Sequence, residues 1–290
     1  MEVMNFATHD VVTVAPSDSI DKAISLMEER DFHHLVVTMG REVIGMVSDR
    51  DILISTGWML SVERQAQGKQ DAKGRVVGPV FVHQIMSRPV VCLEANHTAR
   101  DAALIMLDHK ISAVPVLKHD RLVGLVTETD LMDWLNELAV DDVPPDSLVN
   151  GEVRALMRAK VLTVAPEVLL ERVIHLLRYR RIRHVPVEVQ GKLVGIISDR
   201  DVRRALGWAG VRDAQAEIEG RLIENETPRT AGEIMHTAMW TVDPFDSVRE
   251  ALHQMVHARI HSLPVVDGQL LRGIITQTDL VRVIAREHLL

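Results

Sequence analysis

The chain has 290 residues, of which 47% are apolar, 26% charged and only 3% aromatic, so it can form a globular core built mainly from aliphatic side chains. The net charge of −8 argues against non-specific nucleic-acid binding, which requires lysine and arginine to meet phosphates, and no apolar run approaches the roughly 18–20 residues of a membrane span. A single cysteine, Cys92, excludes an internal disulfide and makes a cysteine-based metal site unexpected, so we expect a cytoplasmic protein.

The first predicted elements form a compact unit at the start of the chain. The short apolar run VVTVAP at 11–16 predicts a strand. Apolar residues within 20–27 then recur at spacing i, i+3, i+4 and i+7, which is one face of an α-helix. HLVVT at 34–38 and EVIGMVS at 42–48 predict two strands joined by a tight turn, and the tetrapeptide SDRD at 48–51 leads into a second apolar helix.

The same order of elements returns three more times along the chain. Each copy carries a glycine, two apolar residues, a serine or threonine and, three residues later, an aspartate. Capping boxes at Thr98–Asp101 and Ser247–Glu250 predict the helix starts of the second and fourth copies. The four glycines lie inside predicted strands, which they weaken, so a packed helix or a ligand is expected to approach the backbone there. The glycines are Gly45, Gly124, Gly195 and Gly273.

The four copies alternate in sequence. The first and third share SDRD, whereas the second and fourth end in TETD and TQTD, which indicates that a two-repeat unit was itself duplicated. The acidic, proline-rich stretch at 139–152 predicts a linker between the two halves. Polar connectors are expected inside each half at 59–80 and 209–230, the second of them partly helical at 211–224.

Repeats of this length, with T-V in the first strand, an apolar-Pro-Val second strand and the recurring Ser/Thr-x-x-Asp, resemble cystathionine β-synthase (CBS) domains. Four repeats in two pairs resemble two tandem Bateman modules. The first copy departs from the pattern by carrying Val36 instead of proline, and the second by carrying Cys92 instead of threonine. The resemblance implies an α/β (α+β) fold of four β-α-β-β-α repeats in two pseudo-twofold pairs. The first module is expected at 1–140 with repeats at about 4–58 and 83–138, and the second at 152–290 with repeats at about 153–208 and 231–288.

The resemblance also implies a function in energy sensing. We expect a stand-alone regulatory protein, not an enzyme, that binds AMP, ADP or ATP in clefts between paired repeats and needs no cofactor. The alternatives are a ligand-free structural or protein-interaction module and a binder of S-adenosylmethionine. The sequence carries no P-loop, nucleophile elbow or G-x-G-x-x-G motif that would favour catalysis. The regulated partner protein is unknown, and the halves are expected to assemble as an intramolecular four-repeat disc or a homodimer.

The recurring Ser/Thr-x-x-Asp has two interpretations. It is close to a capping box and would be explained by helix capping with no ligand at all. A helix N-terminus also suits phosphate, and an acidic side chain there can accept the hydroxyls of a ribose. The resemblance assigns the ribose to the last aspartate of each copy and the phosphates to the hydroxyl before it and to nearby basic residues. The ribose candidates are Asp51, Asp130, Asp201 and Asp279, and the phosphate candidates are Ser48, Thr127, Ser198, Thr276, Arg50, Arg200, His34, Arg183, His184 and His261.

Histidines offer one further candidate site. His253 and His257 are spaced i, i+4 on a predicted helix and could chelate zinc, but no acidic or cysteine partner lies nearby in the sequence. We therefore expect no metal site.

Overall fold

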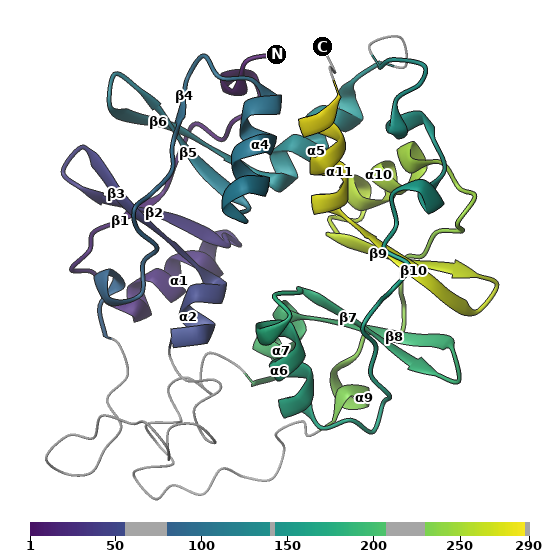
Figure 1. Cartoon of the computed structure of the whole chain (residues 1–290). Helices are drawn as coiled ribbons and strands as arrows, with labels where there is room; N and C mark the ends of the chain where they lie inside the picture. The colour runs from purple at the N-terminus through teal and green to yellow at the C-terminus, as the bar shows by residue number, and fades with distance from the viewer. Residues whose placement is uncertain (56–79, 140–142, 207–229, 288–290) are drawn as a thin grey trace, which may run out of the picture.

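The computed structural model describes residues 1–55, 80–139, 143–206 and 230–287, which form four units of one plan (Figure 1). Repeat 1 comprises β1 (Thr13–Val14), α1 (Ile20–Arg30), β2 (His34–Met39), β3 (Glu42–Ser48) and α2 (Asp49–Ser55). Repeat 2 comprises β4 (Leu93–Glu94), α4 (Ala99–His109), β5 (Ala113–Lys118), β6 (Arg121–Thr127) and α5 (Glu128–Glu137). The predicted α/β (α+β) fold with four repeats is confirmed.

The second half repeats the plan with a shorter first strand. Repeat 3 contains α6 (Leu170–Tyr179), β7 (His184–Val189), β8 (Lys192–Ser198) and α7 (Asp199–Leu206), and repeat 4 contains α10 (Val248–His257), β9 (Ser262–Asp267), β10 (Leu270–Thr276) and α11 (Gln277–Arg286). The strands predicted at the start of these repeats are reduced to single parallel bridges, Val164 with Val187 and Val242 with Val265. The connector helix predicted at 211–224, like most of the connectors at 59–80 and 209–230, lies outside the described residues.

Helix capping follows the sequence signals closely. The α4 box is complete, because Thr98 accepts from the backbone of Asp101 and the Asp101 carboxylate accepts from the backbone of Thr98. In α10 the Ser247 hydroxyl accepts from the Glu250 backbone, and the structure shows only this half of the predicted box. The apolar stripe predicted for α1 is buried as expected.

A short helical turn precedes each repeat and packs against the other repeat of its pair. These turns are η1 (Val3–Asn5), η2 (Val82–Gln84), η5 (Val153–Ala155) and α9 (Ala231–Ile234). The residues just after these turns pack against a glycine in the strand that we call the third strand of each repeat. The third strands are β3, β6, β8 and β10. A Cβ added to Gly45 would come within 2.8 Å of the Met86 sulfur, and one added to Gly273 within 2.9 Å of the Arg158 carbonyl oxygen. The predicted close approach is therefore confirmed, although the approaching group is an extended chain segment and not a helix or a ligand.

The repeats associate through three kinds of contact: strand pairing, apolar packing and polar bonds. Strands β8 and β10 pair where Leu270 faces Lys192, and this contact joins repeats 3 and 4 in one four-stranded sheet. Helices α4, α5, α10 and α11 of repeats 2 and 4 share one large apolar core, whereas repeats 1 and 3 have separate, smaller cores. Repeats 1 and 3 meet through polar bonds, such as the 2.8 Å ion pair between Arg203 and Asp49. The junction between repeats 2 and 4 is thus mainly apolar, with a few hydrogen bonds such as that from Thr278 to Glu128, and that between repeats 1 and 3 is polar.

The stretch predicted as a linker is partly built into the core. Val143 and Val149 are almost fully buried within the core shared by repeats 2 and 4. The turn η4 (Leu148–Asn150) is fastened by the Glu287 carboxylate, which accepts from the Leu148 backbone at 2.9 Å and from the Ser147 hydroxyl. The polar composition of this stretch gave no sign of the packing, because only a few apolar side chains take part in it. The module boundaries at residues 140 and 152 stay predictions.

No helix in the described part of the chain combines the length and apolar character that a bilayer crossing needs.

Candidate functional site

The four repeats surround a central cavity of about 1930 Å³ whose wall includes residues from every repeat. Helices α2, α5, α7 and α11 all begin at this cavity, because each follows a third strand that ends there. Thirteen lysine and arginine residues line the wall against seven aspartate and glutamate residues, although the whole chain carries a net charge of −8. Positive charge is therefore concentrated at the centre, as a site for anions requires.

The predicted caps are present at the cavity. In α2 the Ser48 hydroxyl accepts from the Asp51 backbone at 3.1 Å, and Asp51 Oδ2 accepts from both the backbone and the hydroxyl of Ser48 at 2.8 and 2.6 Å. The capping box is repeated in α5 by Thr127 and Asp130, in α7 by Ser198 and Asp201, and in α11 by Thr276 and Asp279. The hydroxyl hydrogen and Oδ2 are thus used inside the cap, which leaves Oδ1 of each aspartate as the atom that can bind a ligand.

The four Oδ1 atoms have different surroundings. Asp201 Oδ1 lies 2.7 Å from His236 Nε2, and Asp279 Oδ1 accepts from Arg158 Nε at 3.1 Å and from Arg282. The Oδ1 atoms of Asp51 and Asp130 have no hydrogen-bond partner among the described residues. Both of these aspartates are half-buried, and burial raises the pKa of each carboxyl. An unpaired carboxylate oxygen in such a place is stabilised by any donor that reaches it.

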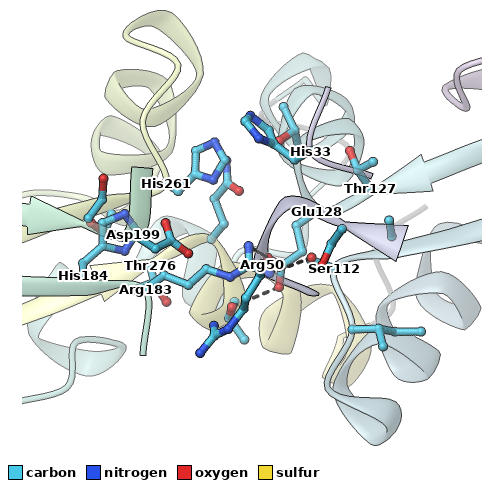
Figure 2. Close-up of a pocket in the computed structure, with 18 of the residues that line it drawn as sticks. His33, Arg50, Ser112, Thr127, Glu128, Arg183, His184, Asp199, His261 and Thr276 are labelled. Atoms are coloured by element: carbon cyan, nitrogen blue, oxygen red, sulfur yellow. Dashed lines mark hydrogen bonds and ion pairs between the residues drawn. The ribbon is translucent and has the colours of Figure 1, made fainter. Parts of the chain in front are cut away.

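Twelve of the fourteen candidate residues line the cavity; the exceptions are Asp130 and Asp279. Figure 2 shows Arg183 extending from repeat 3 towards repeat 2, where it donates to the Ser112 hydroxyl at 2.7 Å and lies 3.9 Å from the Glu128 carboxylate. His34 Nε2 lies 3.0 Å from the same Ser112 hydroxyl. These polar side chains therefore connect three repeats.

The two arginines of the SDRD motifs take part in contacts between repeats. Arg50 donates to the Leu177 carbonyl of repeat 3 at 3.0 Å. Arg200 lies 2.5 Å from His33 Nε2 of repeat 1 and 3.3 Å from His261 Nε2 of repeat 4. Both arginines line the cavity, and their role in phosphate binding stays a prediction.

Three histidines of the wall are neutral near pH 7. Burial lowers the pKa of His34 and of His184 to about 4, although Asp49 opposes the shift at His34 and Asp201 opposes it at His184. Burial, together with the charge of Arg200, lowers the pKa of His261 to about 2. Without a ligand, these three histidines therefore add no positive charge to the wall.

The sequence prediction missed the acidic residues directly after the caps. Asp49, Glu128 and Asp199 open α2, α5 and α7 and face the cavity. Burial tends to raise the pKa of Asp49, but a hydrogen bond with His33 and the charges of His33 and Arg203 lower it to about 2. Burial is the main cause of the raised pKa values of Glu128 and Asp199. The sequence does carry a signal for these residues, because an acidic residue directly follows the capping hydroxyl in three of the four repeats.

No group of three or more metal-ligating side chains occurs within the part of the chain that the structure describes. The His253 and His257 rings stack on α10 with centroids 6.1 Å apart.

Comparison with known proteins yields one family and several archaeal relatives. A family model for the CBS domain matches residues 3–55, 82–137, 153–207 and 231–286. The uncharacterized protein MJ1404 of Methanocaldococcus jannaschii is 28% identical over 98% of this chain, which spans 62% of the length of that relative. The uncharacterized protein MJ1225 of the same organism is 27% identical over 98% of this chain and 99% of its own length.

Solved structures resemble the whole chain. The crystal structure of MJ1225, described as a candidate archaeal homolog of g-AMPK, matches with a TM-score of 0.77 at 26% identity and covers 97% of this chain and 99% of that one. A conserved protein from Pyrococcus horikoshii has the same fold, with a TM-score of 0.65 at 20% identity over 98% of this chain and all of its own.

Proposed function

Because this chain belongs to the CBS domain family, with four CBS domains that account for most of its length, we propose that it is a regulatory protein that binds an adenine nucleotide at its central cavity. The observation that carries the proposal is that the basic cavity wall includes Asp51, a helix-capping aspartate whose Oδ1 is unpaired among the described residues. Asp130, whose Oδ1 is unpaired as well, lies outside the wall but caps a helix that begins at it, with Thr127 and Glu128 among the lining residues. AMP, ADP and ATP combine a vicinal diol, which suits a carboxylate, with phosphates, which suit arginine.

The proposed binding mode uses the predicted residues in distinct roles. The ribose hydroxyls donate to Oδ1 of an aspartate such as Asp51, while Oδ2 keeps its cap. The phosphates face the cavity, where Arg50, Arg183 and Arg200 are available together with the histidines beside them. Since Arg50 and Arg200 now bond to other repeats, a phosphate that recruits them changes those contacts. Ligand binding at the cavity thus alters the polar junction between repeats 1 and 3, and a partner protein can respond to that change.

The description of MJ1225 as a candidate archaeal homolog of g-AMPK supports the proposed regulatory function, and the matched length of the two chains supports carrying it over. S-adenosylmethionine shares the adenosine but brings a sulfonium cation, which a basic wall disfavours. A ligand-free interaction module remains the alternative, because the caps are complete without any ligand.

The first test is thermal unfolding in the presence of AMP, ADP, ATP, GMP or S-adenosylmethionine. A ligand at 100 times its Kd adds about 2.7 kcal/mol, which corresponds to an increase in Tm of several degrees. We expect the adenine nucleotides to stabilise the protein more than GMP or S-adenosylmethionine does. Failure of every nucleotide at millimolar concentration would favour the ligand-free module.

The site assignment is tested with a pair of matched variants. Asp51→Asn keeps an oxygen for the cap and places an amide donor where the ribose hydroxyls need an acceptor. Asp101→Asn makes the same change in the α4 cap, whose hydrogen bonds match those of Asp51, at a residue outside the cavity wall. We expect weaker nucleotide binding in Asp51→Asn alone. Equal affinity in both variants would refute the ribose role of Asp51.

A further inference from the structure

The four chain segments that cross the third strands share one structural position, which we call the bridge position. Thr8, Ser87, Arg158 and His236 each form an antiparallel bridge with a third strand, opposite Leu125, Met46, Ile274 and Ile196 respectively. In each bridge the backbone N–H of both residues donates to the carbonyl of the other, at distances between 2.8 and 3.3 Å. The four side chains at this bridge position are therefore placed alike, each on the strand that leads to one capping aspartate.

In the second half of the chain, the side chain at the bridge position binds that aspartate. Arg158 Nε donates to Asp279 Oδ1 at 3.1 Å, and His236 Nε2 lies 2.7 Å from Asp201 Oδ1. Both aspartates are buried, with exposed fractions of 3% and 8%. Arg282 also bonds to Asp279, and Arg204 lies 3.9 Å from Asp201.

In the first half of the chain, the bridge position carries small neutral side chains. Thr8 leads towards Asp130 and Ser87 towards Asp51, and neither hydroxyl is bonded to its aspartate in the described part of the chain. Asp51 and Asp130 are also more exposed than their two counterparts. A serine or threonine can neither neutralise the carboxylate nor reach across the space that an arginine or histidine fills.

We infer that the side chain at the bridge position decides which capping aspartates accept a ribose, so that Asp51 and Asp130 bind nucleotide while Asp201 and Asp279 do not. The reason is competition for one atom. A diol must donate to Oδ1, and in the second half it would first have to displace a charge-assisted bond or a histidine contact from a buried carboxylate. Of these two aspartates, Asp279 is the less accessible to a ribose, because two arginines donate to its Oδ1.

This inference rests on the proposed nucleotide binding and assigns it to the first pair of repeats. The second pair then keeps its aspartates for internal contacts, an ion pair between Arg158 and Asp279 and a close contact between His236 and Asp201, which hold these segments against β10 and β8. The two pairs of one chain thereby have separate tasks, ligand binding in the first and structural support in the second.

The experiment counts AMP molecules bound per full-length chain by native mass spectrometry and calorimetry. The wild type is expected to bind two. Ser87→Arg places an arginine at the position equivalent to Arg158, next to Asp51, and should reduce the count to one. His236→Ser removes the nearest partner of Asp201 Oδ1, leaving among the described residues only Arg204 at 3.9 Å, and should raise the count to three. Adding Asp201→Asn to that variant should return the count to two.

The outcomes separate the inference from the proposal on which it rests. If no variant binds AMP, the proposed function fails and the inference fails with it. If the wild type binds AMP but neither Ser87→Arg nor His236→Ser changes the count, the function stands and the bridge position does not select the sites. Should Ser87→Arg prove unfolded by circular dichroism, His236→Ser with and without Asp201→Asn decides the question alone.

Discussion

Replacing Gly273 with alanine tests how closely the segment after η5 lies on β10. The new Cβ would come within 2.9 Å of the Arg158 carbonyl oxygen and 2.8 Å of the Met157 sulfur, whereas ordinary contacts begin at 3.4 Å. Met157 can move its flexible end. The Arg158 carbonyl cannot recede freely, because it accepts from the Ile274 backbone at 3.1 Å while the Arg158 backbone donates to Ile274 at 2.9 Å. Overpacking of this kind costs about 1–3 kcal/mol.

Gly124→Ala is the matched control in the second repeat. Its Cβ would lie 3.3 Å from the Ala7 Cβ and the Thr8 carbonyl, a contact that a small shift relieves. Relative to glycine, alanine inside a strand gains about 0.5–1 kcal/mol, so the control should be near neutral while Gly273→Ala is destabilised by about 1–2 kcal/mol. Urea unfolding monitored by circular dichroism measures the difference. Equal stability of the two variants would refute the close approach of the Arg158 segment.

Two further predictions concern the polar centre. The pKa of His34 and of His184 is about 4 in the folded protein, against about 6.5 in the unfolded chain. Between these two pH values the unfolded chain binds more protons than the folded protein does. The free energy of unfolding is therefore highest above pH 6.5 and falls as the pH decreases towards 4. Because both rings are partly exposed, solvent screens the effect to roughly 1–2 kcal/mol per histidine. Thermal unfolding at pH 7.5 and 5 checks this, and an unchanged pH slope in His34→Asn/His184→Asn would contradict it. Arg203→Ala should lower the free energy of unfolding by about 1–2 kcal/mol, because half-buried Asp49 is left with fewer donors. The control Lys22→Ala removes an exposed ion pair and should lower it by less than about 0.5 kcal/mol. Similar losses in the two variants would argue against a polar junction between repeats 1 and 3.

Much of the local structure could be predicted because it depends on local physics. The helices follow from the i, i+3, i+4, i+7 apolar spacing, and the caps follow from a hydroxyl three residues before an acid. Both are set within one or two helical turns. The glycines inside strands also signalled a close approach correctly, although the sequence could not say that the approaching group is the segment before a neighbouring repeat.

The arrangement of the site depends on contacts between distant residues, which no local pattern encodes. Asp279 is bonded to Arg158, 121 positions away, and Arg183 to Ser112, 71 positions away. The sequence placed all four aspartates in one class because their local motifs are alike, whereas the structure separates them by the partner of Oδ1. The core shared by repeats 2 and 4 was hidden for the same reason, since duplicated units look equivalent in sequence.

A crystal structure of the full chain grown with AMP would show which capping aspartates hold the ribose. We expect AMP in the first pair of repeats, with the ribose hydroxyls on Oδ1 of Asp51 and of Asp130 and the phosphates turned to the basic cavity. AMP bound only beside Asp201 or Asp279, or with its ribose away from every capping aspartate, would contradict this expectation.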